Sequence, residues 1–134
     1  RDSGSMVVPT GFDWHWLLGD ETALPAVARR LAELPASAVA TVRIQLNNLA
    51  DQRTLASAAQ VDLQWVSALP AAVEALALPP GAGFVWAAGE HSDMAAVRRA
   101  MLAKPGVDPK RMRISAYWKR GAADHHEDLV SAAG

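Results

Sequence analysis

The sequence predicts a small α/β domain, built as a doubly wound parallel five-stranded sheet with helices on both faces. Apolar, β-branched segments alternate with helical segments along the chain, which is typical of parallel sheets with right-handed crossovers. The length of 134 residues suits one domain. A hydrophobic content of 51% is enough for a buried core.

The first half of the chain predicts two strands flanking one helix. Residues 14–18 and 39–46 are apolar or β-branched and predict strands. Residues 21–34 predict a helix, since an apolar stripe comprises Leu24, Val27, Ala28 and Leu31. The opposite side, expected to face solvent, comprises Arg29, Arg30 and Glu33. Pro25 fits the first turn, and Pro35 ends the helix.

The second half predicts three more strands. After a polar loop over residues 47–60, strands are expected at 61–66, 84–88 and 112–118. The helices between them are expected at 70–77 and 92–103, the second with Ser92 as its N-cap. Residues 13–121 thus form the domain, residues 1–12 read as a linker, and residues 122–134 read as a polar tail.

The bulk composition excludes several classes of function. A net charge of −1 and a pI of about 6.5 disfavour non-specific nucleic-acid binding. The absence of cysteine excludes disulfides, thiolate metal sites and cysteine nucleophiles. No run approaches the roughly 18 apolar residues of a membrane span, and no secretory signal is visible, so we expect a cytoplasmic protein.

The turn after the first strand is the strongest candidate for a binding site. Gly19, Asp20, Glu21 and Thr22 join an apolar strand to a helix start, and unpaired N–H groups at such a corner can bind a pyrophosphate. A turn of this kind also needs a glycine and an Asp N-cap without any ligand. The residues alone leave both interpretations open.

Two other strand ends carry candidate residues. Gly89 and Glu90 follow the most apolar strand, where a glycine lets a flat ring approach the backbone. The last strand ends in Tyr117, Trp118, Lys119 and Arg120, which can stack on a planar ring and attract an anion. Helix capping and ordinary solvated charges explain the same residues equally well.

Several catalytic motifs are absent from the sequence. There is no Gly-x-Gly-x-x-Gly fingerprint, no Walker loop and no Gly-x-Ser-x-Gly elbow. Residues 124–128 could chelate a metal, but adjacent residues in a polar tail rarely form a preorganised site, so we expect no metal.

Taken together, three segments resemble the siderophore-interacting protein family, which comprises flavin-dependent ferric-siderophore reductases. They are GDETALPA at 19–26, VWAAGE at 85–90 and ISAYWKRG at 114–121. Ala116 and Lys119 stand where the family usually has Gly and Arg. Gly4 to Pro9 is similar to the passage that leads out of the family's flavin barrel, so we expect a remnant linker there rather than a cloning scar.

The resemblance implies the C-terminal, ferredoxin-reductase-like domain that binds NAD(P)H. Hydride would pass to FAD held by an N-terminal β-barrel, and electrons would then reduce a ferric siderophore. Gly19, Asp20, Glu21 and Thr22 would shape the corner that holds the dinucleotide, and Gly89 and Glu90 would lie by the nicotinamide. Tyr117 and Trp118 would lie near the flavin, and Lys119 and Arg120 would face the siderophore.

One departure from the family bears on the choice of nucleotide. Members often carry carboxylates at and after the end of the second strand, where this chain has Gln45, Asn48 and Gln52 beside Arg53. A carboxylate there would repel a 2′-phosphate. The change predicts NADPH rather than NADH, with Arg53 as a cofactor-binding residue.

The role of the chain by itself stays open among three hypotheses. It is the NAD(P)H-binding half of a reductase, a shortened relative that pairs with a separate flavin-binding chain, or a non-catalytic module that binds a nucleotide or a partner. In each case we expect no reductase activity without a flavin-binding domain in cis or in trans. An exposed interface face leaves a homodimer open.

Overall fold

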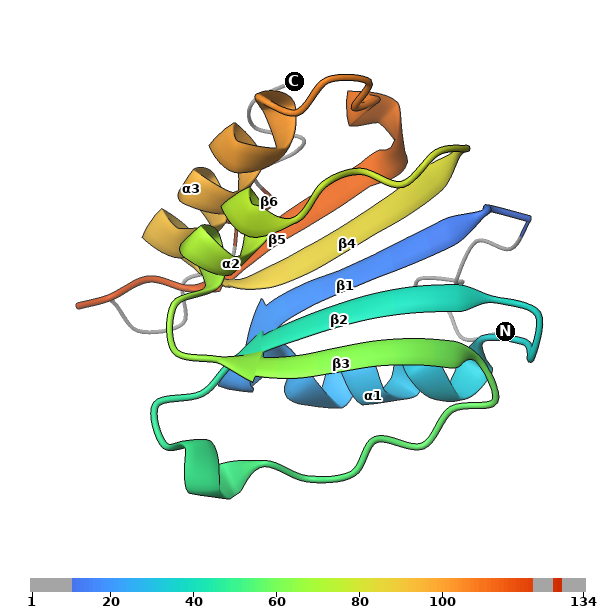
Figure 1. Ribbon diagram of the computed structural model, residues 1–134. Coiled ribbons are helices and arrows are strands. Elements are labelled where there is room, and N and C mark those ends of the chain that lie inside the picture. The colour runs from blue at the N-terminus through green and yellow to red at the C-terminus, as the bar shows by residue number, and fades with distance from the viewer. Residues whose placement is uncertain (1–10, 122–126, 129–134) are drawn as a thin grey trace.

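The computed structural model describes residues 11–121 and 127–128, which form one twisted sheet with helices on both faces (Figure 1). The strand order is β3-β2-β1-β4-β5-β6. Strands β1 to β5 are parallel, and β6 runs antiparallel to β5. The predicted fold class is therefore confirmed, with one short antiparallel strand added at the edge.

The elements follow the predicted order closely. The strands are β1 (Trp14–Asp20), β2 (Val39–Gln45), β3 (Gln60–Val66), β4 (Gly83–Glu90), β5 (Met112–Trp118) and β6 (Glu127–Asp128). The helices are α1 (Leu24–Glu33), α2 (Leu69–Ala75) and α3 (His91–Leu102). Short 3₁₀ turns are η1 (Glu21–Ala23), η2 (Leu49–Asp51) and η3 (Pro109–Arg111).

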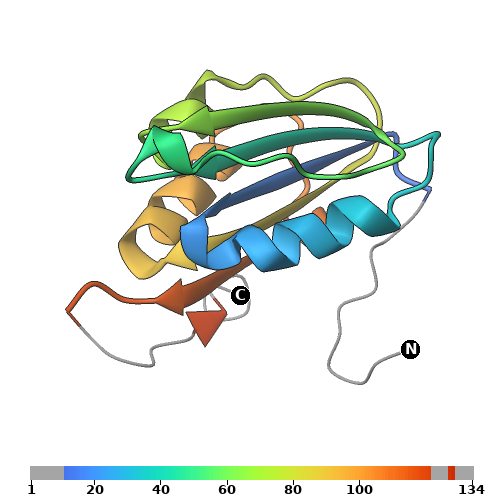
Figure 2. The same cartoon turned by 90° about the horizontal axis from the view of Figure 1, so that it is seen from below.

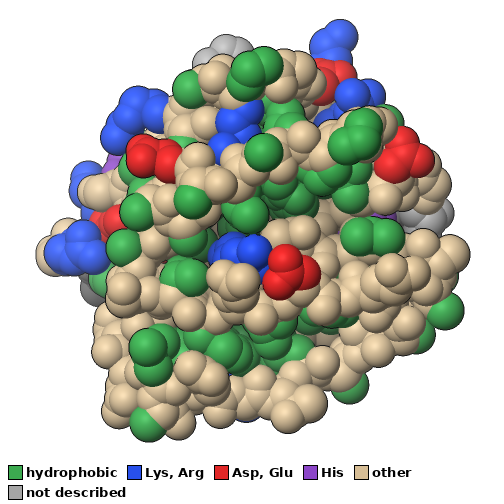
Figure 3. Space-filling model, viewed as in Figure 1, with side chains coloured by type: hydrophobic (Ala, Val, Ile, Leu, Met, Phe, Trp, Pro, Cys, Tyr) green, Lys and Arg blue, Asp and Glu red, His purple; other side chains and the backbone are tan. Residues whose placement is uncertain are grey.

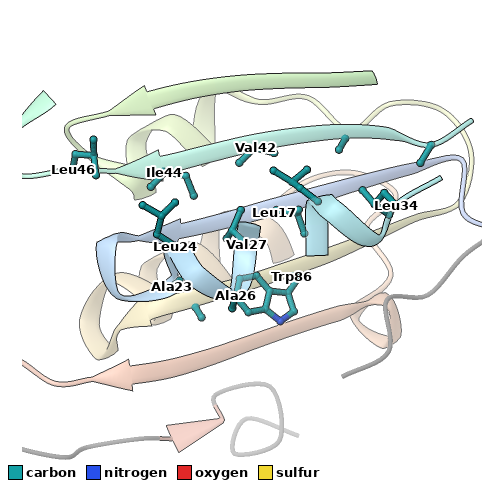
Figure 4. Packing of buried hydrophobic residues seen from close by; sticks show 14 residues of the cluster. Leu17, Ala23, Leu24, Ala26, Val27, Leu34, Val42, Ile44, Leu46 and Trp86 are labelled. Atoms are coloured by element: carbon teal, nitrogen blue, oxygen red, sulfur yellow. The ribbon is translucent and has the colours of Figure 1, made fainter. Parts of the chain in front are cut away.

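Helix α1 covers one face of the sheet. Its apolar side packs on inward-facing residues of β1, β2 and β4, as Figure 4 shows for Leu24, Val27, Ile44 and Trp86. Each parallel strand needs cover on both faces, and β1 is buried along its whole length. Helix α1 therefore supplies the cover that β1, β2 and β4 need on this face of the sheet.

Helices α2 and α3 cover the opposite face (Figures 1 and 2). Their buried side chains pack on β1, β4 and β5, with Met94, Val97 and Met101 of α3 fully enclosed. On this face basic and acidic side chains are interspersed, and hydrophobic side chains are spread among them (Figure 3). No helix of the described residues is both long and apolar enough to span a bilayer.

Three details differ from the sequence-based expectations. Arg30 is buried rather than solvent-facing, because its guanidinium carbon lies 4.4 Å from the centroid of the Trp86 ring. Helix α3 is capped by Glu90, not by Ser92, since the Glu90 carboxylate accepts the Asp93 N–H. Part of the expected tail is ordered as β6, whose Glu127 and Asp128 pair with β5; the rest of the tail, like the expected linker over 1–10, lies outside the described residues.

Candidate functional site

The carboxyl ends of the parallel strands meet along one edge of the sheet, where the arrowheads lie in Figure 1. Strands β1 and β4 are neighbours there, with Gly19 opposite Ala88. Gly89 in turn lies opposite Ala116 of β5. The turn after β1 and the end of β4 therefore lie side by side, and this point, where the strand order reverses, is where such sheets bind ligands.

The buried carboxylate of Asp20 joins three strand ends. Its Oδ2 accepts the backbone N–H of Glu90 and the indole N–H of Trp118, each at 3.0 Å. Its Oδ1 accepts the N–H of Thr22 at 3.0 Å and the Thr22 hydroxyl at 2.5 Å. We call Asp20, Thr22, Glu90 and Trp118 the Asp20 network; it connects β1, η1, β4 and β5 through one charged group.

Two glycines make room for this network. A Cβ on Gly89 would lie 2.8 Å from Asp20 Oδ2, and a Cβ on Gly19 would lie 2.8 Å from the Ala23 Cβ and 2.9 Å from the Ala88 carbonyl oxygen. These distances are shorter than real Cβ contacts. Gly89 thus leaves room for the Asp20 carboxylate, and Gly19 leaves room for the close turn into η1. Both glycines therefore have a structural role that needs no ligand.

Glu90 is the second buried carboxylate at this edge, with 0% of its surface exposed. Its Oε1 accepts the Asp93 N–H at 2.9 Å, and its Oε2 accepts the Arg120 N–H at 3.2 Å. The Arg120 guanidinium lies 3.5 Å from Oε1. Burial alone would raise the pKa of Glu90, but these backbone donors, with that of Ser92 and the Arg120 charge, outweigh it and lower the pKa below its ordinary value.

Asp93 in the first turn of α3 is shifted in the opposite direction. Burial raises its pKa, and the nearby charge of Glu90 adds to the rise. A hydrogen bond with the Gln45 side chain opposes it. Gln45 also accepts the Leu69 N–H at 2.7 Å, so this residue links the end of β2 to the starts of α2 and α3.

A hollow of about 420 Å³ opens above these strand ends. We call it the edge hollow, and its lining consists of Asp20, Glu21, Thr22, Gln45, Asn47, Trp118 and Arg120. On the β2 side the Glu21 carboxylate accepts the Asn47 N–H at 3.0 Å, and both residues line the hollow. On the β5 side the Arg120 guanidinium carbon lies 5.6 Å from the centroid of the Trp118 ring.

The structure brings some of the expected site residues together and separates others. Asp20, Glu21, Thr22, Trp118 and Arg120 line the edge hollow, and Glu90 lies beneath it and is buried. Arg53 and Lys119 are exposed but are not part of the lining.

Tyr117 and Trp118, both of which the resemblance placed near a flavin, have different surroundings at the end of β5. Tyr117 packs in the α1 layer, with its ring centroid 6.4 Å from that of Trp86. Trp118 lines the edge hollow and donates to Asp20. Of these two residues, Trp118 is the one that lines the edge hollow.

Sequence reasoning missed Asn47 and Asp93. Asn47 lines the hollow through a contact with Glu21, 26 positions earlier in the chain, and no local pattern signals such a contact. Glu21 also places a carboxylate at the end of β2, where the sequence showed only amides.

Two other hollows lie away from this edge. One of about 720 Å³ lies between α2 and α3, and one of about 440 Å³ lies near Trp14 at the amino ends of the strands. The first is the larger, but ligands of parallel sheets bind at the carboxyl edge, so the edge hollow is the better candidate. Within residues 11–121 and 127–128, no group of three or more His, Cys, Asp or Glu is arranged to hold a metal ion.

Comparison with known proteins places this geometry among siderophore proteins. A family model described as "Siderophore-interacting protein" matches residues 12–121. The ferric vibriobactin reductase ViuB of Vibrio cholerae is 27% identical over 87% of this chain and 47% of its own length. An NADPH-dependent ferric-chelate reductase of Escherichia coli is 30% identical over 86% of this chain and 48% of its own length.

Solved structures give the same result. A siderophore utilization protein from T. fusca superposes with a TM-score of 0.79 at 31% identity, covering 87% of this chain and 49% of that one. The siderophore-interacting protein SipS from Aeromonas hydrophila gives 0.71 at 25% identity, covering 81% of this chain and 51% of that one. The chain thus spans about half the length of the relatives it matches.

Asp20→Asn should destabilise the fold by about 1–3 kcal/mol, because an amide cannot accept from all four donors and leaves a buried N–H unsatisfied. Chemical denaturation measures this loss. Asp51→Asn removes the same charge at an exposed position of η2 and should change the unfolding free energy by no more than about 0.5 kcal/mol. Equal losses in the two variants would contradict the structural role of Asp20.

The acid limb of stability should depend on Glu90 and Asp93 with opposite signs. Glu90 has a lowered pKa, so its contribution is present above its ordinary value of 4.5 and is lost as the pH falls through the folded-state pKa. Asp93 has a raised pKa, so its charged form costs stability that is recovered on acidification.

Denaturation from neutral pH downward tests these signs. Glu90→Gln should flatten the loss of stability below about pH 4.5, whereas Asp93→Asn should steepen it. The same change of slope in both variants would refute the assigned directions.

Proposed function

Because this chain belongs to the siderophore-interacting protein family, we propose that it forms the NAD(P)H-binding part of a flavin-dependent ferric-siderophore reductase. The observation that carries the proposal is the edge hollow at the reversal of strand order, the position at which sheets of this topology bind dinucleotides. The names of the Vibrio cholerae and Escherichia coli relatives support the reductase role.

The residues around the hollow fit a dinucleotide in chemical type. Trp118 offers an aromatic wall whose orientation is fixed by its hydrogen bond to Asp20. Asn47 and Gln45 supply amides on the β2 side, and Arg120 supplies a cation on the β5 side. A concave site with a few polar groups beside an aromatic ring is typical of cofactor sites.

When bound, the nicotinamide would supply a hydride to FAD held by a separate flavin-binding domain, and the ferric siderophore would be reduced with release of iron(II). That domain, in the same or another chain, is the partner we propose. The role of this chain is to orient the nicotinamide at the domain edge: the Asp20 network holds the strand ends in place, and the buried Glu90 fixes the start of α3.

We favour NADPH over NADH as the donor. The Escherichia coli relative, an NADPH-dependent ferric-chelate reductase, supports this choice. Arg53 does not contribute to this preference through the hollow, since it is not in the lining and Glu21 supplies a carboxylate near the end of β2.

Calorimetric titration of the purified chain with NADPH and NADH tests the proposal. Asn47→Asp places a negative charge in the hollow and should weaken NADPH binding several-fold by repulsion of the phosphates. Gln60→Glu adds the same charge at an exposed position at the amino end of β3, away from the hollow, and should leave the affinity unchanged.

Two results would contradict this function. One is a chain that binds neither nucleotide while it remains folded. The other is reduction of a ferric siderophore by the chain and NADPH alone, because the proposed reaction needs FAD held by a flavin-binding domain.

A further inference from the structure

We propose that Arg120 binds the phosphates of the nucleotide, a role that the sequence assigned to the turn at Gly19–Thr22. The inference rests on the proposed function and concerns the same edge hollow. It changes the expectation for Arg120, which the family resemblance placed toward the siderophore.

Carboxylates of this chain cap its own helix starts at the carboxyl edge. The Thr22 N–H of η1 donates to Asp20, and the Asp93 N–H of α3 donates to Glu90. The Asn47 N–H at the end of β2 donates to Glu21. A phosphate at any of these positions would compete with a carboxylate that already occupies the donor.

The charges around the edge hollow are unevenly placed. Its lining contains two carboxylates, Asp20 and Glu21, and one cation, Arg120. The charge of Asp20 is compensated by four hydrogen-bond donors, but Glu21 is exposed. A diphosphate therefore meets repulsion on the Glu21 side and attraction only on the Arg120 side of this lining.

Arg120 is held in place by contacts with Glu90, yet most of its side chain is exposed to solvent. Its backbone N–H donates to Glu90, and its guanidinium contacts Glu90 at 3.5 Å and lies over the Trp118 ring. The side chain is nevertheless 65% exposed. A guanidinium anchored on one side keeps N–H donors for an anion on the other, and its planar fork suits phosphate.

The experiment compares ligands with and without phosphate on the purified chain. Arg120→Gln should weaken NADPH binding about 10-fold or more, since a charge-assisted contact is lost, and leave adenosine binding unchanged. Arg120→Lys keeps the charge but loses the planar guanidinium. Its NADPH affinity should lie between that of the parent chain and that of Arg120→Gln. Lys110→Gln removes an exposed charge of η3, at the opposite edge of the sheet, and should leave NADPH binding unchanged.

A second arm separates the nucleotide from the siderophore as the source of the anion. The same variants are titrated with ferric tris-catecholate, whose affinity should not depend on Arg120. Arg120→Gln retains the backbone N–H that donates to Glu90, so it should fold, and its thermal midpoint checks this.

The outcomes are distinguishable. NADPH binding that is equal in the parent chain and Arg120→Gln, or a loss confined to the catecholate complex, would overturn the role of Arg120 while leaving the proposed function intact. A folded parent chain that binds no NADPH would overturn the proposed function and this inference with it.

Discussion

The structure depends on one buried carboxylate. Asp20 receives four hydrogen bonds from residues of η1, β4 and β5, and these elements lie up to 98 positions away in the chain. A buried charge is costly unless it is fully hydrogen-bonded. The donors belong to three elements, η1, β4 and β5. The free-energy cost of burying the carboxylate is therefore offset only when these elements are assembled together, so they hold the carboxyl edge in one arrangement.

This arrangement has a consequence for ligand binding. Helix starts at the edge of a parallel sheet are usually available to anions, but here Asp20 and Glu90 satisfy the N–H groups of Thr22 and Asp93 internally. The edge gains rigidity and a Trp118 ring of fixed orientation, and it loses backbone donors for phosphate. The positive charge needed for a dinucleotide then has to come from a side chain, and Arg120 is the cation in the lining.

Most of the fold could be predicted from the sequence, because buried parallel strands are continuous apolar runs and their alternation with helices fixes the topology. The site was harder. Asp20 as an N-cap follows from its position before a helix, yet its bonds to Glu90 and Trp118 depend on strand order. Tyr117 and Trp118 lie where the pairing of β5 with β4 shifts in register, which no local pattern shows. The Glu21–Asn47 contact and the burial of Arg30 on Trp86 arise only from tertiary packing.

We propose that the edge built by the Asp20 network is the nucleotide site. A crystal structure of the chain with NADPH tests it most directly. We expect a dinucleotide in the edge hollow, with its phosphates within hydrogen-bond distance of Arg120 and the Asp20–Trp118 contact intact. A nucleotide seated in the groove between α2 and α3, or phosphates on the Thr22 N–H with Asp20 displaced, would contradict it.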